Sequence, residues 1–201
     1  MITSDFRKKM VNNWFSYLQI QICKSFESLE NKKSKFLRRD WRKENIRQGG
    51  GTSYLLTGGN IFDKVGVNKS TVSGIFPKKF RSNIFGAKNK GNYWASGVSV
   101  VAHMKNPKIP AIHFNTRFIV TSKEWFGGGV DATPSHEDKI EKKIIHSSLK
   151  KICLQNKKNY DKYKKWCDEY FYLPHRKEAR GIGGIFFDYE TKNWIKNFKF
   201  V

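Results

Sequence analysis

Serine, histidine, arginine and aspartate side chains recur along one stretch of the chain, within and beside two apolar runs. The stretch runs from Gly97 to Asp131 and includes Ser99, His103, His113 and Arg117. Arginine can hold a carboxylate through two parallel N–H groups, and histidine exchanges a proton near neutral pH. Aspartate accepts hydrogen bonds from several N–H donors. These residue types predict a site for an anionic substrate whose reaction needs proton transfer.

Two β-strands, 94–103 and 111–121, must position these groups. Side chains two or four residues apart on a strand share a face, so Ser99 lies on the same side as His103. By the same period, His113, Asn115 and Arg117 form a second row. If the two strands are adjacent and antiparallel, both polar rows face one pocket.

Apolar periodicity predicts the elements around these strands. Residues 6–29 form an amphipathic helix, 31–40 a basic connector, and 52–56 with 60–67 a β-hairpin. Residues 124–134 form an aromatic and glycine-rich turn. Further helices follow at 138–154 and 160–173, then a strand at 184–188. The buried side of the 138–154 helix is expected to carry Ile140, Ile144, Ile145, Leu149 and Ile152.

Composition favours a single globular domain over residues 1–201, with 38% hydrophobic and 15% aromatic residues. No apolar run reaches the roughly 18 residues that a membrane span requires, and the first residues lack the apolar core of a secretory signal. We therefore expect a cytoplasmic protein without a membrane span. The three cysteines, Cys23, Cys153 and Cys167, are widely spaced, which indicates reduced buried thiols.

The formal net charge of +22, from 39 Lys and Arg against 17 Asp and Glu, has three explanations. It can reflect a lysine-rich coding bias, attraction of a small polyanionic substrate, or binding to nucleic acid. The chain contains no recognised nucleic-acid-binding module. Charge alone does not choose among the three.

Four segments, in order along 41–201, resemble the oxygen-dependent coproporphyrinogen III oxidase family of haem synthesis. They are GGGTSYLLTGGNIFDKVGVNKSTVSG, GVSVVAHMKNPKIPAIHFNTRF, WFGGGVDATP and KKWCDEYFYLPHRKEARGIGGIFFD. The resemblance implies an α+β fold, with a largely antiparallel sheet flanked by helices on both faces, and a homodimer. It also implies oxidative decarboxylation of two propionates of coproporphyrinogen III to vinyls, giving protoporphyrinogen IX. It further implies dioxygen as co-substrate and no required organic cofactor, although some bacterial members of the family are described with a divalent metal cation.

The same resemblance implies roles for individual residues. Ser99 and the Asn115-Thr116-Arg117 segment match the family's substrate-binding residues. His113 matches its proposed proton donor, and Asp131 the aspartate after its triple glycine. Its remaining histidine positions fall on His103, His146 and His175.

Each role has a structural alternative. Arg117 either binds a substrate carboxylate or forms a salt bridge within the protein. Asp131 either accepts hydrogen bonds from the pyrrole N–H groups or bonds to its own backbone in a turn. A metal site would comprise His103, His113, His146 and His175, but their spacing matches no recognised ligand motif.

The sequence departs from the family pattern at Met104, Ala132 and Asp63, where proline, leucine and glutamate are usual. The family continues into strands with further arginine-glycine motifs and its dimerisation segment, which we expect to be missing after a final helix at 194–201. This expectation leaves three hypotheses: an active oxidase, half of a split enzyme, or an inactive remnant. A basic nucleic-acid-binding protein is the alternative from another class.

Overall fold

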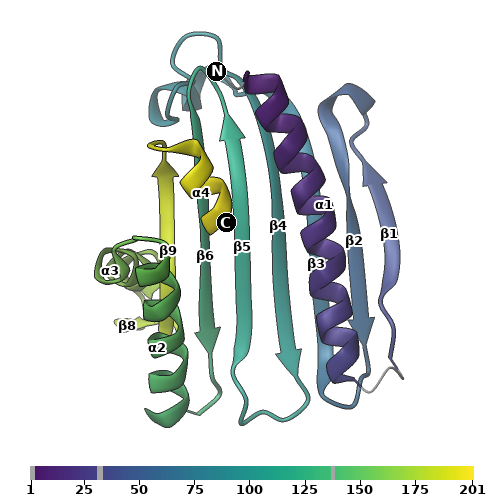
Figure 1. Ribbon diagram of the computed structural model, residues 1–201, viewed down its shortest axis with the longest axis vertical. Helices are drawn as coiled ribbons and strands as arrows, with labels where there is room; N and C mark the ends of the chain where they lie inside the picture. The colour runs from purple at the N-terminus through teal and green to yellow at the C-terminus, as the bar shows by residue number, and fades with distance from the viewer. Residues whose placement is uncertain (1–2, 31–33, 137–138) are drawn as a thin grey trace.

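The computed structural model describes residues 3–30, 34–136 and 139–201, which form a seven-stranded antiparallel sheet with helices (Figure 1). The strand order is β1-β2-β3-β4-β5-β6-β9. The strands are β1 (Leu37–Arg42), β2 (Gly49–Thr57), β3 (Phe62–Ile75), β4 (Asn92–Met104), β5 (Ala111–Val120), β6 (Glu124–Thr133) and β9 (Gly183–Glu190). The helices are α1 (Ser4–Leu29), α2 (Lys139–Gln155), α3 (Tyr160–Tyr170) and α4 (Trp194–Phe200). Strands β7 (Tyr172–Leu173) and β8 (Glu178–Ala179) form a separate two-stranded sheet, and short 3-10 helices cover Ile46–Gln48 and Lys78–Asn83.

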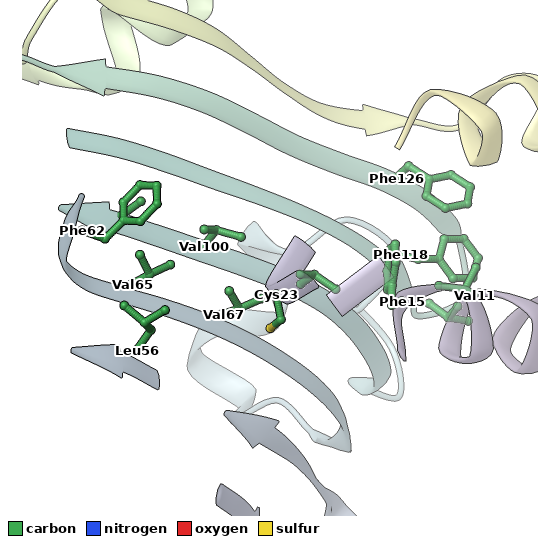
Figure 2. Packing of buried hydrophobic residues seen from close by; sticks show 13 residues of the cluster. Val11, Phe15, Cys23, Leu56, Phe62, Val65, Val67, Val100, Phe118 and Phe126 are labelled. Carbon is green, nitrogen blue, oxygen red and sulfur yellow. The ribbon is translucent and has the colours of Figure 1, made fainter. Parts of the chain in front are cut away.

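One face of the sheet carries the core, because α1 and α4 lie across it (Figure 1). Helix α1 buries Val11, Phe15 and Cys23 against alternate apolar side chains of the strands, as Figure 2 shows. Helix α4 packs Trp194 and Phe198 on the same cluster. The strand period of two therefore sends the other half of the side chains to the opposite face, which we call the open face.

Helix α3 stands at the β9 edge of the sheet and contacts side chains from both faces. Tyr163 packs on Phe187, whereas Trp166 and Tyr170 pack on Phe186. Over β2 to β5, no helix of the described chain covers the open face. The predicted α+β fold with a large antiparallel sheet is confirmed. Among the described residues, no helix combines the length and apolar character needed to cross a bilayer.

Two segments that the sequence predicts to be irregular are strands. The prediction of a turn at 124–134 is wrong, because Glu124–Thr133 is strand β6, which pairs with β5 on one side and β9 on the other. Part of the 31–40 connector, from Leu37, belongs to edge strand β1, while 31–33 lie outside the described residues. A glycine run indicates a turn by composition, but in β6 it allows neighbouring side chains to lie directly over the backbone.

The buried face predicted for 138–154 is also partly wrong, and Asp138 lies outside the described residues. Leu149 is buried and Ile145 half-buried, but Ile140, Ile144 and Ile152 are 71%, 59% and 45% exposed. Helical periodicity identifies an apolar stripe, but it does not show whether a neighbouring element covers the whole stripe.

Candidate functional site

The two polar rows predicted on 94–103 and 111–121 lie next to each other. Strands β4 and β5 are antiparallel neighbours, with Ser99 opposite Asn115 and Gly97 opposite Arg117. In the next ladder, His113 is opposite Asp131. Strand pairing therefore brings the predicted serine, histidine, asparagine, arginine and aspartate onto the open face of three adjacent strands.

Asp131 lies deeply buried beside His113. The Asp131 side chain is 4% exposed, and its Oδ2 lies 3.4 Å from His113 Nδ1 and 2.7 Å from an Nη2 of Arg180. The geometry at 3.4 Å is not that of a hydrogen bond, so within the described chain His113 Nδ1 is buried without a hydrogen-bond partner. A small movement of either side chain would close this contact, as happens when catalytic hydrogen bonds tighten on substrate binding.

Arg180 takes part in this arrangement through its ion pair with Asp131. The nearby Glu178 pairs with Arg176 and not with Arg180. The Arg180 guanidinium also lies 3.9 Å from the ring centroid of Phe171. Its positive charge therefore lies directly against the buried Asp131 side chain next to His113.

Arg117 already holds one carboxylate. Its Nη2 donates to Asp188 Oδ2 at 2.8 Å and its Nη1 donates to Asn115 Oδ1 at 2.8 Å. Trp125 Nε1 donates to the other oxygen of Asp188 at 3.0 Å. The Arg117 side chain is 29% exposed and lies on the open face, where the remaining N–H groups are available to a ligand.

A hollow of about 670 Å³ lies on the open face of β1 to β4. Of the predicted site residues, His103 lines it, and the ring centroids of His103 and His113 are 6.4 Å apart. Arg39 and Lys64 supply positive charge and Trp41 an exposed aromatic ring. Its size is within the range of small-molecule sites in proteins.

Thr116 is separated from the other predicted binding residues. Its side chain is 2% exposed and points to the face covered by α1, between Phe114 and Phe118 in the strand alternation. Asn115 and Arg117 point the other way. The Thr116 side chain is therefore removed from the predicted substrate-binding set.

The four histidines are not assembled into a metal site. His146 Nε2 lies 2.8 Å from the Ile182 carbonyl, and its Nδ1 lies 2.8 Å from the Tyr160 hydroxyl, so both ring nitrogens are engaged. His175 lies in the exposed turn between β7 and β8. No group of three or more potential ligands is positioned for a metal in the described part of the chain. These residues do not fit a four-histidine site as arranged here.

The cysteines are free and buried, as expected from their spacing. Burial raises the pKa of the Cys23 and Cys167 thiols to about 12. At neutral pH they are protonated, which makes them poor nucleophiles and metal ligands.

The sequence interpretation did not include Arg180, Asp188 and Trp125 in the site. Asp188 carried a usable signal, because it directly follows the apolar run of a buried strand, where a carboxylate needs a partner. Arg180 carried none, since its partner on β6 lies 49 residues away in the chain.

Comparison of the sequence with known proteins identifies the family of this chain. The coproporphyrinogen III oxidase family profile matches residues 10–201. This chain belongs to that family. An oxygen-dependent coproporphyrinogen-III oxidase of Rickettsia akari (strain Hartford) is 47% identical over 203 residues, covering 96% of this chain and 72% of the relative. Proteins of the same name from Rickettsia rickettsii (strain Sheila Smith) and Rickettsia bellii (strain OSU 85-389) are 46% and 45% identical with the same coverage.

The resemblance inferred from four segments is thus confirmed across nearly the whole chain. Coproporphyrinogen III oxidase membership also accounts for the large antiparallel sheet. It leaves the individual site residues as predictions, because their assignment depends on geometry and on experiments with variants.

Proposed function

We propose that this chain catalyses the oxygen-dependent conversion of coproporphyrinogen III to protoporphyrinogen IX, with the reacting propionate on the open face beside His113. The main support is the placement of His113, Asp131 and Arg117 on one face of three adjacent strands in a chain of this family. Family membership makes the chain an oxidoreductase of haem biosynthesis with dioxygen as co-substrate.

The chemistry defines what the side chains must do. In each propionate, a hydrogen leaves the carbon next to the pyrrole ring together with its bonding electron pair. The carbon–carbon bond to the carboxylate then breaks and CO₂ departs. The electron pair of that carbon–carbon bond forms the vinyl double bond. Dioxygen accepts the hydrogen and the two electrons, and it needs one further proton to become a neutral product. We assign transfer of that proton to His113.

Arg117 and Asn115 are assigned to the substrate carboxylate, and Ser99 to a second polar contact in the adjacent row. A guanidinium that keeps free N–H groups next to a held carboxylate can bind another carboxylate with defined direction. The hollow beside His103 is proposed to receive the rest of the macrocycle, with Arg39 and Lys64 near its other propionates.

Asp131 is assigned to orienting His113. Both interactions of its Oδ2 are with protein groups, and the side chain is almost fully buried. This placement favours the ring of His113 over the pyrrole N–H groups as its main partner. A buried carboxylate beside an imidazole fixes the tautomer and stabilises the protonated ring.

Activity of the purified chain tests the proposal. Coproporphyrinogen III is incubated with the chain in air, and protoporphyrin fluorescence is followed after oxidation of the product. His113→Ala is expected to lower the rate by about 10²-fold or more, the usual contribution of a general acid. The matched control is His136→Ala, which removes an exposed histidine outside the site and should leave the rate unchanged. Turnover retained by His113→Ala would exclude this residue as the proton donor.

A second arm addresses the split-enzyme hypothesis. The relatives are longer than this chain, which covers 72% of their length. The assay is therefore repeated with a polypeptide that supplies the unmatched part of a relative. Product only in the mixture would make this chain one part of a split enzyme, and no product in either arm would support the inactive remnant.

The finer expectations are also part of the proposal. We assign the chain to the cytoplasm. We also assign it to a homodimer, and light scattering during size-exclusion chromatography measures this oligomeric state. Support for self-association comes from edge strand β1, whose residues are all exposed. Requirement for a divalent cation is tested by assaying the chain with and without a chelator, although the histidines as arranged do not support such a site.

A further inference from the structure

Asp188 is fixed on three sides by groups of the protein. Its Oδ2 accepts a hydrogen bond from Arg117, and its Oδ1 accepts from Trp125 Nε1 and from the backbone N–H of Tyr189, both at 3.0 Å. The Asp188 side chain is 16% exposed, so solvent screens this ion pair less than a surface pair. Trp125 is itself buried and stacks with Tyr189 at a ring-centroid distance of 5.7 Å.

An irregularity in the β6-β9 ladder aims Asp188 at Arg117. Gly128 pairs with Phe187 but Phe126 pairs with Glu190, so Asp188 and Tyr189 together stand opposite Gly127. Tyr189 has a φ of 56°, a left-handed conformation that is uncommon for a bulky residue. Bulges of this kind redirect a side chain and are frequent next to active sites.

Gly127 leaves the space in which the pair meets. A Cβ built on Gly127 would collide with Asp188 Oδ1 and would lie 2.9 Å from Arg117 Nε. The guanidinium therefore lies directly over the β6 backbone, held by Asp188 on one side and by Asn115 on the other.

We propose that Asp188 is a positioning residue for substrate binding, which holds the guanidinium of Arg117 in the orientation that receives a propionate of the tetrapyrrole. This inference rests on the proposed function. Two of the five guanidinium N–H groups donate to Asp188 and Asn115, and the other three make no hydrogen bond within the described chain. An arginine fixed before binding loses less rotational freedom when the ligand arrives, so the substrate binds more tightly.

Asp188→Asn tests the proposal with little change in shape. The amide oxygen can keep the bonds from Trp125 and Tyr189, while the amide NH₂ faces the N–H donors of Arg117 and cannot accept from them. The matched control is Glu190→Gln, two residues along β9. Glu190 accepts from Lys158 at 2.6 Å and from Tyr163 at 2.7 Å, and neither partner belongs to the site.

The first measurement follows the guanidinium itself and needs no substrate. In ¹⁵N-resolved NMR spectra, a held guanidinium shows separate Nη signals because rotation about its C–N bonds is slow. The Arg117 signals, identified by their loss in Arg117→Lys, should be separate in the wild type and in Glu190→Gln. They should merge in Asp188→Asn. Separate signals in Asp188→Asn would overturn the positioning role.

The second measurement is binding of coproporphyrin III, a stable fluorescent tetracarboxylate, compared with its tetramethyl ester. Asp188→Asn should weaken tetracarboxylate binding at least about tenfold, in the range for hydrogen bonds to charged groups, with little effect on the ester. Combining it with Arg117→Lys should add little, because both changes remove the same contact. Glu190→Gln should lower stability without changing binding.

Each remaining outcome is assigned. Equal or tighter tetracarboxylate binding by Asp188→Asn would overturn the proposal, since Asp188 would then be irrelevant to the substrate or compete with it. If the wild type binds neither porphyrin, the proposed function fails, while the NMR result still decides whether Asp188 orders Arg117.

Discussion

Two arginines near the open face are each paired with an aspartate before any substrate is present. Arg117 pairs with Asp188 and Arg180 pairs with Asp131. Each pair brings little net charge to the site, so recognition of a propionate there depends on the direction of the remaining N–H groups. The same pairing makes these arginines geometrically specific, which a free lysine ammonium would not be.

Gly127→Ala is expected to reduce stability and to disturb the Arg117–Asp188 pair. The new Cβ would meet both side chains over the β6 backbone, and overpacking of this kind costs about 1–3 kcal/mol. Urea unfolding measures the loss. The matched control is Gly66→Ala on β3, where the nearest atom would be 4.0 Å away. A loss no larger than that of the control would show that the space over Gly127 is not required.

At the scale of elements, the sheet is positioned on α1 by contacts that are not all apolar. Glu30, the C-cap residue of α1, is fully buried and accepts backbone N–H bonds from Asn60, Ile61 and Phe62 at 2.6–2.8 Å. Burial alone would raise the pKa of Glu30, but these three donors and the charge of Lys105 hold it below its ordinary value. One carboxylate thus joins the end of α1 to the β2–β3 turn.

Glu30→Gln is expected to destabilise the fold by about 2 kcal/mol or more near pH 6, since the charged acceptor of three buried donors is lost. A carboxyl with a lowered folded-state pKa stabilises the fold above its unfolded-state pKa, near 4.5, and this contribution disappears as pH falls through the folded-state pKa. The stability difference between wild type and variant should therefore shrink in acid. Urea unfolding from about pH 6 to about pH 3 measures it. A difference independent of pH would contradict the role of the charge.

At the scale of the molecule, the positive charge is spread over many lysines outside the site. The formal net charge of +22 creates a field that attracts a substrate with four carboxylates. The fold does not by itself distinguish this explanation from nucleic-acid binding or from coding bias. The dependence of ligand binding on salt concentration distinguishes them.

The association rate of coproporphyrin III is expected to fall as ionic strength rises from about 0.01 M to about 0.15 M, because the screening length shortens from about 30 Å to about 8 Å. Stopped-flow fluorescence measures this rate, and the uncharged tetramethyl ester is the control. A rate independent of salt would show that the net charge does not steer the substrate. Tight, salt-steep binding of random DNA would instead favour the nucleic-acid hypothesis.

Local periodicity in the sequence by itself determined strands β4 and β5, helix α1 and the face shared by His113, Asn115 and Arg117. The α+β class followed from the resemblance of four segments to the family. The sequence misassigned 124–134, because a glycine run looks the same in a turn and in a strand crossed by side chains. The two polar rows were predicted to share one face on the condition that β4 and β5 pair, and the two strands are paired in the structure.

Tertiary structure alone decided the partners. Arg180 reaches Asp131 from 49 residues away, and Asp188 reaches Arg117 from 71 residues away through a bulge in β9. In the folded chain the Thr116 side chain points to the core, and both ring nitrogens of His146 have partners, the Ile182 carbonyl and the Tyr160 hydroxyl. Contacts between distant strands depend on pairing order and register, and no local pattern in the sequence encodes either.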